Sequence, residues 1–327
     1  MKNIIVTGGL GFIGSNFVNY MSNKYNDKFF VVIDKKDYCS NVENVTKREN
    51  VEIVIGDIRN HELILYICNK FNIDTVVHFA AQSHVDNSFF NSIEFTENNV
   101  LGTHKLLETI KIYNDQSNKI EKFIHVSTDE VYGETIDNCP RNENSILDPT
   151  NPYAASKAAA EFFVKSYYYS YQFPIIITRG NNVYGINQYP EKVIPKFICN
   201  LLNGKKLQIQ GDGSCRRNFI YVEDVCKAFE VIMLKGKIGE IYNIKSDDKN
   251  EYTVLELAKK LIKIYYNDEN YEKYIEHIED RKFNDKRYLI SSDKLIELGW
   301  EPVSLNFEQN IEYLISWYKN YKYRYGL

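Results

Sequence analysis

Short runs of β-branched and other apolar residues alternate with longer amphipathic segments over the first half of the chain. The runs that we expect to form strands are Ile4–Val6, Phe30–Asp34, Val51–Ile55, Thr75–Phe79, Lys122–Ser127 and Pro174–Thr178. The segments of helical length are Phe12–Tyr25, His61–Phe71, Ser92–Asn114 and Pro152–Tyr171. Continuous apolar strands separated by helices are typical of a parallel sheet that helices cover on both faces. The pattern therefore predicts an α/β fold with a doubly wound parallel sheet.

The pattern is looser after Arg179, where glycine and proline interrupt the chain more often. One more strand is expected at Glu240–Ile244, and three helical segments follow it. We expect residues 1–181 and 218–245 to form the main domain. Residues 182–217 and 246–327 are expected to form a smaller α/β lobe over the carboxyl ends of the strands, where such folds bind ligands.

Composition excludes several classes of protein. The 327 residues carry 40 Lys+Arg against 44 Asp+Glu, a net charge of −4, so no positive field indicates a nucleic-acid partner. No apolar stretch is long enough to cross a membrane, and we expect no signal peptide because the first apolar run is too short for one. The six cysteines include no CxxC pair and no histidine at ligand spacing, so we expect free thiols, no metal site and a cytoplasmic protein.

A glycine-rich turn follows the first expected strand, with the spacing Gly8-x-x-Gly11-x-x-Gly14. Without β-carbons, the backbone amides that open the next helix can approach a pyrophosphate. Asp34 follows 20 residues later, where a carboxylate holds ribose hydroxyls and repels a 2′-phosphate. The turn predicts a Rossmann domain that binds NAD rather than NADP, although two lysines after Asp34 could attract the extra phosphate. The expected contacts are Gly8, Gly11, Phe12, Ile13, Gly14, Asp34 and Lys35.

Further cofactor contacts are expected where the third and fourth strands end. Asp57 lies near the adenine in one interpretation and caps the helix at His61 in the other, and the spacing favours neither. The small side chains of Ala80 and Ala81 would let the nicotinamide half pass closely. The remaining residues assigned to the cofactor are Ile58, Asn98, Tyr153 and Lys157.

Tyr153 and Lys157 are four residues apart in a segment rich in helix formers, so both project from one helix face. An ammonium beside a phenol favours the phenolate, and bound NAD⁺ adds further positive charge. Tyr153 could then act as a general base near neutral pH. A surface helix is the alternative, but the position downstream of a dinucleotide turn favours catalysis.

Two adjacent acids, Asp129 and Glu130, follow the fifth expected strand. Consecutive residues leaving a strand point in different directions, so the two carboxyl groups can reach different atoms of one substrate. One acts as an acid and the other as a base only where their surroundings separate their pKa values. A solvated loop is the alternative, but this edge of an α/β sheet is where such enzymes place their chemistry.

Seven motifs give the chain a close resemblance to the nucleotide-sugar 4,6-dehydratases, which are extended short-chain dehydrogenases/reductases with tightly held NAD. The motifs follow one another in the order typical of that family, and the match extends from residue 4 to about residue 300. The glycine turn and YxxxK belong to the whole superfamily, whereas Thr-Asp-Glu ahead of Val-Tyr-Gly is specific. The motifs are GGLGFIG, AAQSHVDNS, STDEVYG, YAASK, RGNNVYG, PEKVIPKF and GDGSCRRNFIYVEDV.

The resemblance implies a reaction with no net redox change. NAD⁺ takes a hydride from C4 of the hexose while Tyr153 removes the O4 proton and Thr128 hydrogen-bonds that oxygen. Glu130 abstracts the C5 hydrogen, Asp129 protonates the departing C6 hydroxyl, and the hydride returns to C6. A 4-epimerase or decarboxylase on the same fold has no need of Asp129, and a non-catalytic NAD sensor needs neither acid nor the Tyr153–Lys157 pair.

The resemblance also assigns residues to the nucleotide sugar. Guanidinium groups can form paired hydrogen bonds with the phosphates of the diphosphate. Lys192, which is isolated, could equally be a surface charge with no contact to substrate. The residues assigned to substrate are Ser83, Thr128, Asn182, Glu191, Lys192, Arg217 and Arg281. Two copies are expected to pair as a homodimer through Ser92–Asn114 and Pro152–Tyr171.

The motif after the fourth strand departs from the dTDP-glucose enzymes of bacteria. Those typically read Glu-Ser-His-Val-Asp-Arg-Ser, whereas this chain has glutamine at Gln82 and asparagine at Asn87. These variants resemble the UDP-glucose branch, the dehydratase part of UDP-rhamnose synthases. UDP-glucose is therefore the favoured substrate. dTDP-glucose is the alternative, because uracil and thymine differ by only one methyl group, a difference worth about 1–3 kcal/mol in a pocket.

Overall fold

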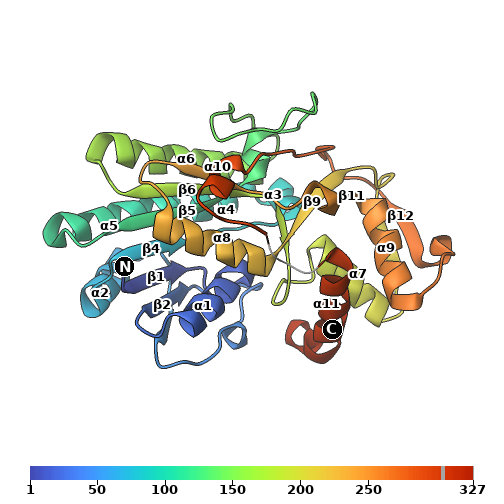
Figure 1. Ribbon diagram of the computed structural model, residues 1–327, viewed down its shortest axis with the longest axis horizontal. Coiled ribbons are helices and arrows are strands. Elements are labelled where there is room, and N and C mark those ends of the chain that lie inside the picture. Colours follow the sequence, from blue (N-terminus) through green and yellow to red (C-terminus); the bar gives the residue numbers. More distant parts are fainter. Residues whose placement is uncertain (303–305, 327) are drawn as a thin grey trace.

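A seven-stranded parallel sheet forms the centre of the computed structural model, which describes residues 1–302 and 306–326 (Figure 1). Every neighbouring pair in this sheet is parallel. In spatial order the strands are β10 (Ile241–Ile244), β6 (Ile175–Gly180), β5 (Lys122–Thr128), β4 (Thr75–His78), β1 (Asn3–Thr7), β2 (Phe29–Asp34) and β3 (Val51–Ile55). The strand order reverses between β1 and β4, which confirms the predicted doubly wound α/β fold.

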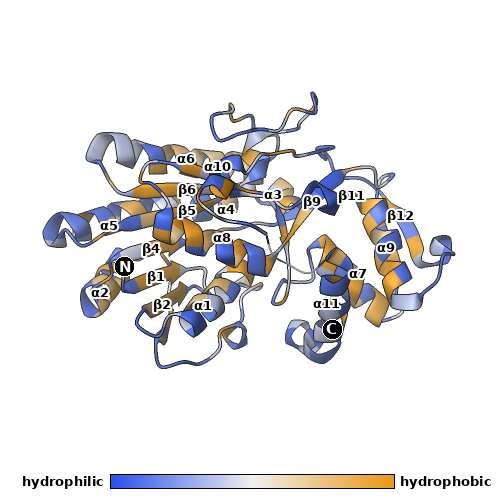
Figure 2. Ribbon diagram, in the orientation of Figure 1, coloured by the Kyte–Doolittle hydropathy of each residue, from blue (hydrophilic) through white to orange (hydrophobic). Residues whose placement is uncertain are grey.

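Two layers of helices cover the sheet, with apolar faces turned toward it (Figure 2). One layer holds α1 (Phe12–Lys24) and α8 (Val222–Lys235), and the other holds α2 (His61–Phe71), α5 (Gly102–Ser117) and α6 (Pro152–Tyr171). Fully buried Phe17 of α1 meets the rings of Phe79 and Phe229, which ties α1 and α8 together beneath β1 and β4. Most residues of the other six strands are buried, as their continuous apolar character predicts, whereas the edge strand β3 is partly exposed.

A smaller lobe extends beyond the sheet and has a core of its own (Figure 1). Its strands are β7 (Asn182–Tyr184), β9 (Arg216–Tyr221) and β11 (Glu251–Thr253) in one sheet, and β8 (Leu207–Gln210) and β12 (Ile275–Ile278) in another. Its helices are α7 (Val193–Leu202), α9 (Val254–Tyr266) and α11 (Phe307–Tyr321). The sequence pattern did not predict these strands, because most have only three or four residues and none shows a long apolar run.

The helix expected at Ser92–Asn114 is present but is not a regular α-helix. After α3 (Val85–Phe90) come α4 (Ser92–Phe95), a π-helical turn at Thr96–Leu101 and then α5, without a break. The wider turn places Asn99 so that its side chain bonds both the N–H and the C=O of Gln82. Such turns are common at functional sites.

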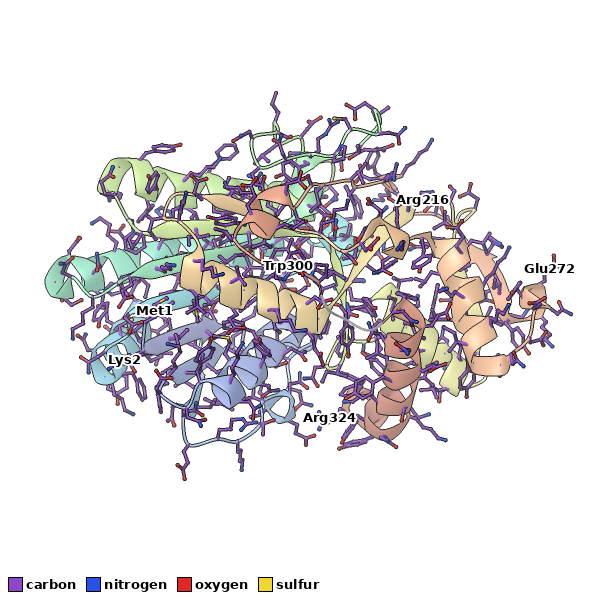
Figure 3. All side chains as sticks on the ribbon, viewed as in Figure 1. Met1, Lys2, Arg216, Glu272, Trp300 and Arg324 are labelled. Atoms are coloured by element: carbon purple, nitrogen blue, oxygen red, sulfur yellow. The ribbon has the colours of Figure 1, made fainter. Side chains whose placement is uncertain are left out.

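The division into two domains stays a prediction. One segment assigned to the lobe, α10 (Asp293–Glu297) with Trp300, packs instead into the core beside α8. The indole N–H of Trp300, labelled in Figure 3, donates to the C=O of Asp224 at 3.1 Å. Across the residues described here, no helix has both the length and the apolar surface needed to traverse a bilayer.

Candidate active site

Two cavities meet at the carboxyl ends of the central strands. The glycine-turn cavity, about 240 Å³, lies over the turn between β1 and α1. The interlobe cavity, about 320 Å³, lies between the sheet and the smaller lobe. Tyr153 and Ser83 line both, so a ligand in one cavity can touch a ligand in the other.

The glycine turn is built for close approach. Gly8 has a φ of +66°, and a β-carbon there would lie 2.6 Å from the backbone nitrogen of Ala80. A β-carbon on Gly14 would lie 2.5 Å from the carbonyl oxygen of Gly8. No side chain caps α1 at Gly11, so the N–H groups of its first turn are available to an anion. The turn fits the pyrophosphate of a dinucleotide.

Asp34 lies at the end of β2 in the wall of the glycine-turn cavity. Burial raises the pKa of its carboxyl, although N–H bonds from Lys36 at 2.8 Å and Leu10 at 3.1 Å stabilise the charged form. The Lys35 ammonium lies 3.1 Å from Asp37 and donates to Asn98 Oδ1 at 3.0 Å. Since Lys35 already has an anionic partner, the cavity suits free ribose hydroxyls better than a 2′-phosphate.

Asp57, Ile58, Ala80 and Ala81 also line the glycine-turn cavity. Burial opposes ionisation of Asp57, but hydrogen bonds from Arg59 hold its pKa below the usual value. The idea that Asp57 caps the helix at His61 is wrong, because the side chain of Asn60 accepts the capping bond from the N–H of Leu63. The position of Asp57 in the cavity wall remains compatible with a contact to the base.

Tyr153 and Lys157 lie in the first turns of α6, which Asn151 caps and Pro152 opens. The expectation that Lys157 lowers the pKa of the Tyr153 phenol is wrong for this arrangement. Burial and the nearby charge of Glu130 raise that pKa, while a hydrogen bond with Thr128 lowers it. The Lys157 ammonium instead donates to the C=O of Val126 at 2.6 Å, and burial lowers its pKa to about 8.

Asp129 begins a 3₁₀ turn, η3 (Asp129–Tyr132), directly after β5, and it is 2% exposed. Burial and the charge of Glu130 raise the pKa of Asp129 to about 7. Asn181 donates to its Oδ2 at 2.7 Å and the Thr128 hydroxyl to its Oδ1 at 3.2 Å, which limits the rise. The protonated form is therefore abundant at neutral pH.

Glu130 is the next residue, yet its surroundings differ. Its side chain is less buried than that of Asp129, and Asn151 donates to its Oε2 at 3.0 Å. Both carboxyl groups line the interlobe cavity together with Thr128 and Tyr153. The site thus combines one buried carboxyl group whose pKa is raised with a second that is hydrogen-bonded in a more solvated position.

Three predicted substrate residues lie in other walls of the interlobe cavity. Arg217 lies 4.7 Å from the centre of the Tyr288 ring and donates to the C=O of Asp285 at 2.9 Å. Arg281 forms an ion pair with Asp86 at 2.6 Å, which joins the lobe to α3. Asn182 is in the cavity wall, with no polar side-chain partner found among the described residues.

The remaining three predicted substrate residues, Ser83, Glu191 and Lys192, lie where the two cavities meet. The Lys192 ammonium donates to the C=O of Ser83 at 2.5 Å, so Lys192 is not the surface charge of the alternative interpretation. Glu191 accepts a hydrogen bond from the Tyr38 hydroxyl at 2.8 Å. Both contacts cross the opening between the lobe and the sheet.

Sequence reasoning missed the amides that hold the reacting groups. Asn181 contacts Asp129, but the motif directed attention to its neighbour Asn182. Asn151, just before the expected helix, was given no role, and it donates to Glu130. Asn99 donates to the hydroxyl of Ser156 on α6 at 2.9 Å. An asparagine beside each strand or helix end is the only sequence signal for these roles.

The fold and these cavities define an extended short-chain dehydrogenase/reductase. A family model described as GDP-mannose 4,6 dehydratase matches residues 5–314. The chain therefore belongs to that family, and its predicted membership of the nucleotide-sugar 4,6-dehydratases is confirmed.

Individual relatives agree with this assignment. A dTDP-D-glucose 4,6-dehydratase of Dictyostelium discoideum is 46% identical, the match covering 98% of this chain and 82% of that protein. A trifunctional UDP-glucose 4,6-dehydratase/UDP-4-keto-6-deoxy-D-glucose 3,5-epimerase/UDP-4-keto-L-rhamnose-reductase of Arabidopsis thaliana is 48% identical over 97% of this chain, which spans about half (47%) of that protein. The crystal structure of the dTDP-glucose 4,6-dehydratase of Streptomyces venezuelae with NAD bound matches with a TM-score of 0.91, 36% identity and coverage of 99% and 98% of the two chains.

Proposed function

We propose that the protein is an NAD-dependent dehydratase that converts UDP-glucose to UDP-4-keto-6-deoxy-glucose, toward UDP-rhamnose or another deoxysugar. The observation that carries the proposal is the pair of adjacent carboxyl groups, Asp129 and Glu130, in different surroundings beside Tyr153. When bound, NAD supplies a hydride acceptor for C4, a hydride donor for C6 and a positive charge that favours ionisation of Tyr153. The glycine turn, Asp34 and the walls of the glycine-turn cavity would hold it.

The side chains divide the proton transfers among them. Tyr153 accepts the O4 proton as C4 is oxidised, with the Thr128 hydroxyl bonded to the same oxygen. The ketone at C4 acidifies the C5 hydrogen, and Glu130 removes that proton. Asp129, protonated because its pKa is about 7, donates to the C6 oxygen, which leaves as water. Arg217 and Arg281 bind the diphosphate through their guanidinium groups.

UDP-glucose is preferred over dTDP-glucose on two grounds. The motif at Gln82–Ser88 resembles the UDP-glucose branch, and the Arabidopsis relative, which is named a UDP-glucose 4,6-dehydratase, is 48% identical over 97% of this chain. The Dictyostelium relative, named for dTDP-glucose, is the counterargument at 46% identity. The two substrates share every atom that reacts.

A direct assay tests the reaction and its substrate together. The pure protein is incubated separately with UDP-glucose, dTDP-glucose and a UDP-uronic acid, and the products are examined by mass spectrometry. We expect loss of one water from UDP-glucose and a 4-keto product, with slower conversion of dTDP-glucose. A product of unchanged mass with inverted C4 would contradict the dehydratase and indicate a 4-epimerase, and loss of carbon dioxide from a UDP-uronic acid would indicate a decarboxylase. Binding of NAD without any turnover would indicate a sensor.

We further propose a cytoplasmic homodimer built on α5 and α6. Large apolar side chains are exposed on and beside these helices, which is unusual for a face that contacts only water. They are Phe90, Ile93, Leu101, Phe162, Tyr169 and Tyr171. All six cysteines are free, as thiols are in the cytoplasm. Light scattering at micromolar concentration should give twice the chain mass, and a monomer would contradict the dimer.

A further inference from the structure

A buried hydrogen-bond network lies behind η3, on the side away from the interlobe cavity. Arg179, near the end of β6, is 1% exposed, and its Nε and Nη2 donate to the Glu161 carboxylate, the shortest bond being 2.6 Å. Its Nη1 donates to the hydroxyl of Tyr132 at 2.7 Å. That hydroxyl donates in turn to Asn243 Oδ1 in β10 at 2.9 Å. Within the described residues, neither cavity is lined by Arg179, Glu161 or Tyr132.

The network joins the elements that carry the reacting groups. Glu161 lies on α6, one turn beyond Lys157, and Tyr132 is the last residue of η3, which begins with Asp129. The guanidinium carbon of Arg179 lies 4.7 Å from the centre of the Tyr132 ring, so the arginine holds both the face and the hydroxyl of this side chain. Asn181, two residues after Arg179, bonds Asp129.

Stability alone does not account for this arrangement. Removing two charges from water is costly, and apolar residues of the same volume often stabilise a core equally well or better. The N–H groups of the planar guanidinium instead point in fixed directions, so one arginine can hold two hydrogen-bond partners in place at once. Here those partners are on α6 and on η3.

We propose, on the basis of the proposed function, that Tyr132 held by Arg179 is a positioning residue that fixes the acid–base pair of η3 relative to Tyr153 on α6. Oxidation at C4 depends on Tyr153 and on the cofactor. Loss of water depends on Asp129 and Glu130 reaching the C6 oxygen and the C5 hydrogen of the same sugar. Disturbing the network should therefore slow the second step more than the first.

Tyr132→Phe is the first test, because it removes only the hydroxyl. The two steps are separated in single-turnover experiments by the rise and decay of absorbance from enzyme-bound NADH. We expect the rise to stay within about twofold of the wild type and the decay to slow roughly 10- to 100-fold, the effect of a small misplacement of reacting groups. Reduced cofactor should then accumulate during turnover.

Arg179→Lys is the second test, and it also decides the question if Tyr132→Phe fails to fold. Lysine keeps a positive charge near Glu161 but cannot bond two partners through a rigid fork. The same slowing of NADH decay is expected. Tyr242→Phe is the matched control, because Tyr242 is a buried tyrosine whose hydroxyl bonds the N–H of Lys237 in the loop before β10. Its kinetics should match the wild type.

The outcomes are separable. NADH that accumulates in Tyr132→Phe or Arg179→Lys but not in Tyr242→Phe supports the inference. Equal slowing of both steps, or no change in either step while circular dichroism shows an intact fold, overturns it and leaves the network a structural feature. A wild-type enzyme that yields no dehydrated product overturns the proposed function and, with it, this inference.

Discussion

Asp129 and Glu130 differ by one methylene group and one position, yet their surroundings give them different chemistry. Asp129 is enclosed at the end of β5, and burial next to the charge of Glu130 favours its protonated form. Glu130 is more open to solvent and bonds Asn151. The proposed division into an acid and a base therefore rests on placement rather than on residue type.

Asp129→Asn tests the acid role. Asparagine keeps the shape and cannot donate a carboxyl proton, so oxidation at C4 should continue while water loss slows by about 10²–10⁴-fold, the usual contribution of a general acid. Enzyme-bound NADH followed by absorbance would accumulate. Unchanged turnover would remove Asp129 from this role.

The pH dependence of water loss follows from the same carboxyl group. The acid form of Asp129 donates the proton, and its pKa of about 7 lies above the usual value. The rate of NADH decay should be constant well below pH 7 and fall about tenfold per pH unit above it. Asp129→Asn should lack this descending limb. A rate that rises through the same range would contradict the assignment.

At the level of elements, the turn between β1 and α1 requires glycine at Gly8 for two reasons, its left-handed φ and the close backbone of Ala80. Two substitutions separate the contributions of these two reasons to stability. Gly8→Ala introduces both a left-handed φ and a clash with the backbone of Ala80, whereas Gly204→Ala has a similar φ of +65° and no atom within 4 Å. Gly204→Ala should cost about 1–2 kcal/mol of unfolding free energy. Gly8→Ala should lower the unfolding free energy by more than this and reduce the amount of NAD retained on purification. Equal losses of unfolding free energy in the two variants, measured by chemical denaturation, would contradict the tight packing at Gly8.

Long apolar strands and well-marked helices could be predicted from sequence, because their periodicity is set by local burial. The helix Pro152–Tyr171 agrees with α6 residue for residue, since Asn151 and Pro152 mark its start and Gln172, with a φ of +52°, marks its end. The π-helical turn at Thr96–Leu101 could not be predicted, because it is stabilised by the distant Gln82. The orientation of Lys157 toward Val126 is likewise a tertiary contact.

At the scale of the whole molecule, the sheet and the smaller lobe form the interlobe cavity together. The ion pair between Asp86 on α3 and Arg281 in the lobe spans the opening at 2.6 Å. Because Arg281 is proposed to bind the diphosphate, we expect Asp86 to compete with the substrate for the same guanidinium and so to lower the affinity.

Asp86→Asn should therefore bind UDP more tightly. The variant loses both a competitor for Arg281 and a negative charge near the diphosphate, and a gain of about 1 kcal/mol, roughly fivefold in Kd, is expected for a partly exposed pair. Isothermal titration calorimetry with UDP provides the measurement. Asp248→Asn, which removes an exposed ion pair with Lys245, is the control. Weaker binding in Asp86→Asn would show that the carboxylate supports the site instead.

The order of segments along the chain has a consequence for producing fragments of the protein. The covering helix α8 (Val222–Lys235) and the edge strand β10 (Ile241–Ile244) follow the first part of the lobe in the sequence, so they are synthesised after it. A fragment truncated after β6 would leave that strand without its neighbour and strip Phe17 and Phe79 of their contact with Phe229. Bare strand edges and uncovered aromatic surface promote aggregation. The nucleotide-binding half should thus be insoluble when expressed as an amino-terminal piece.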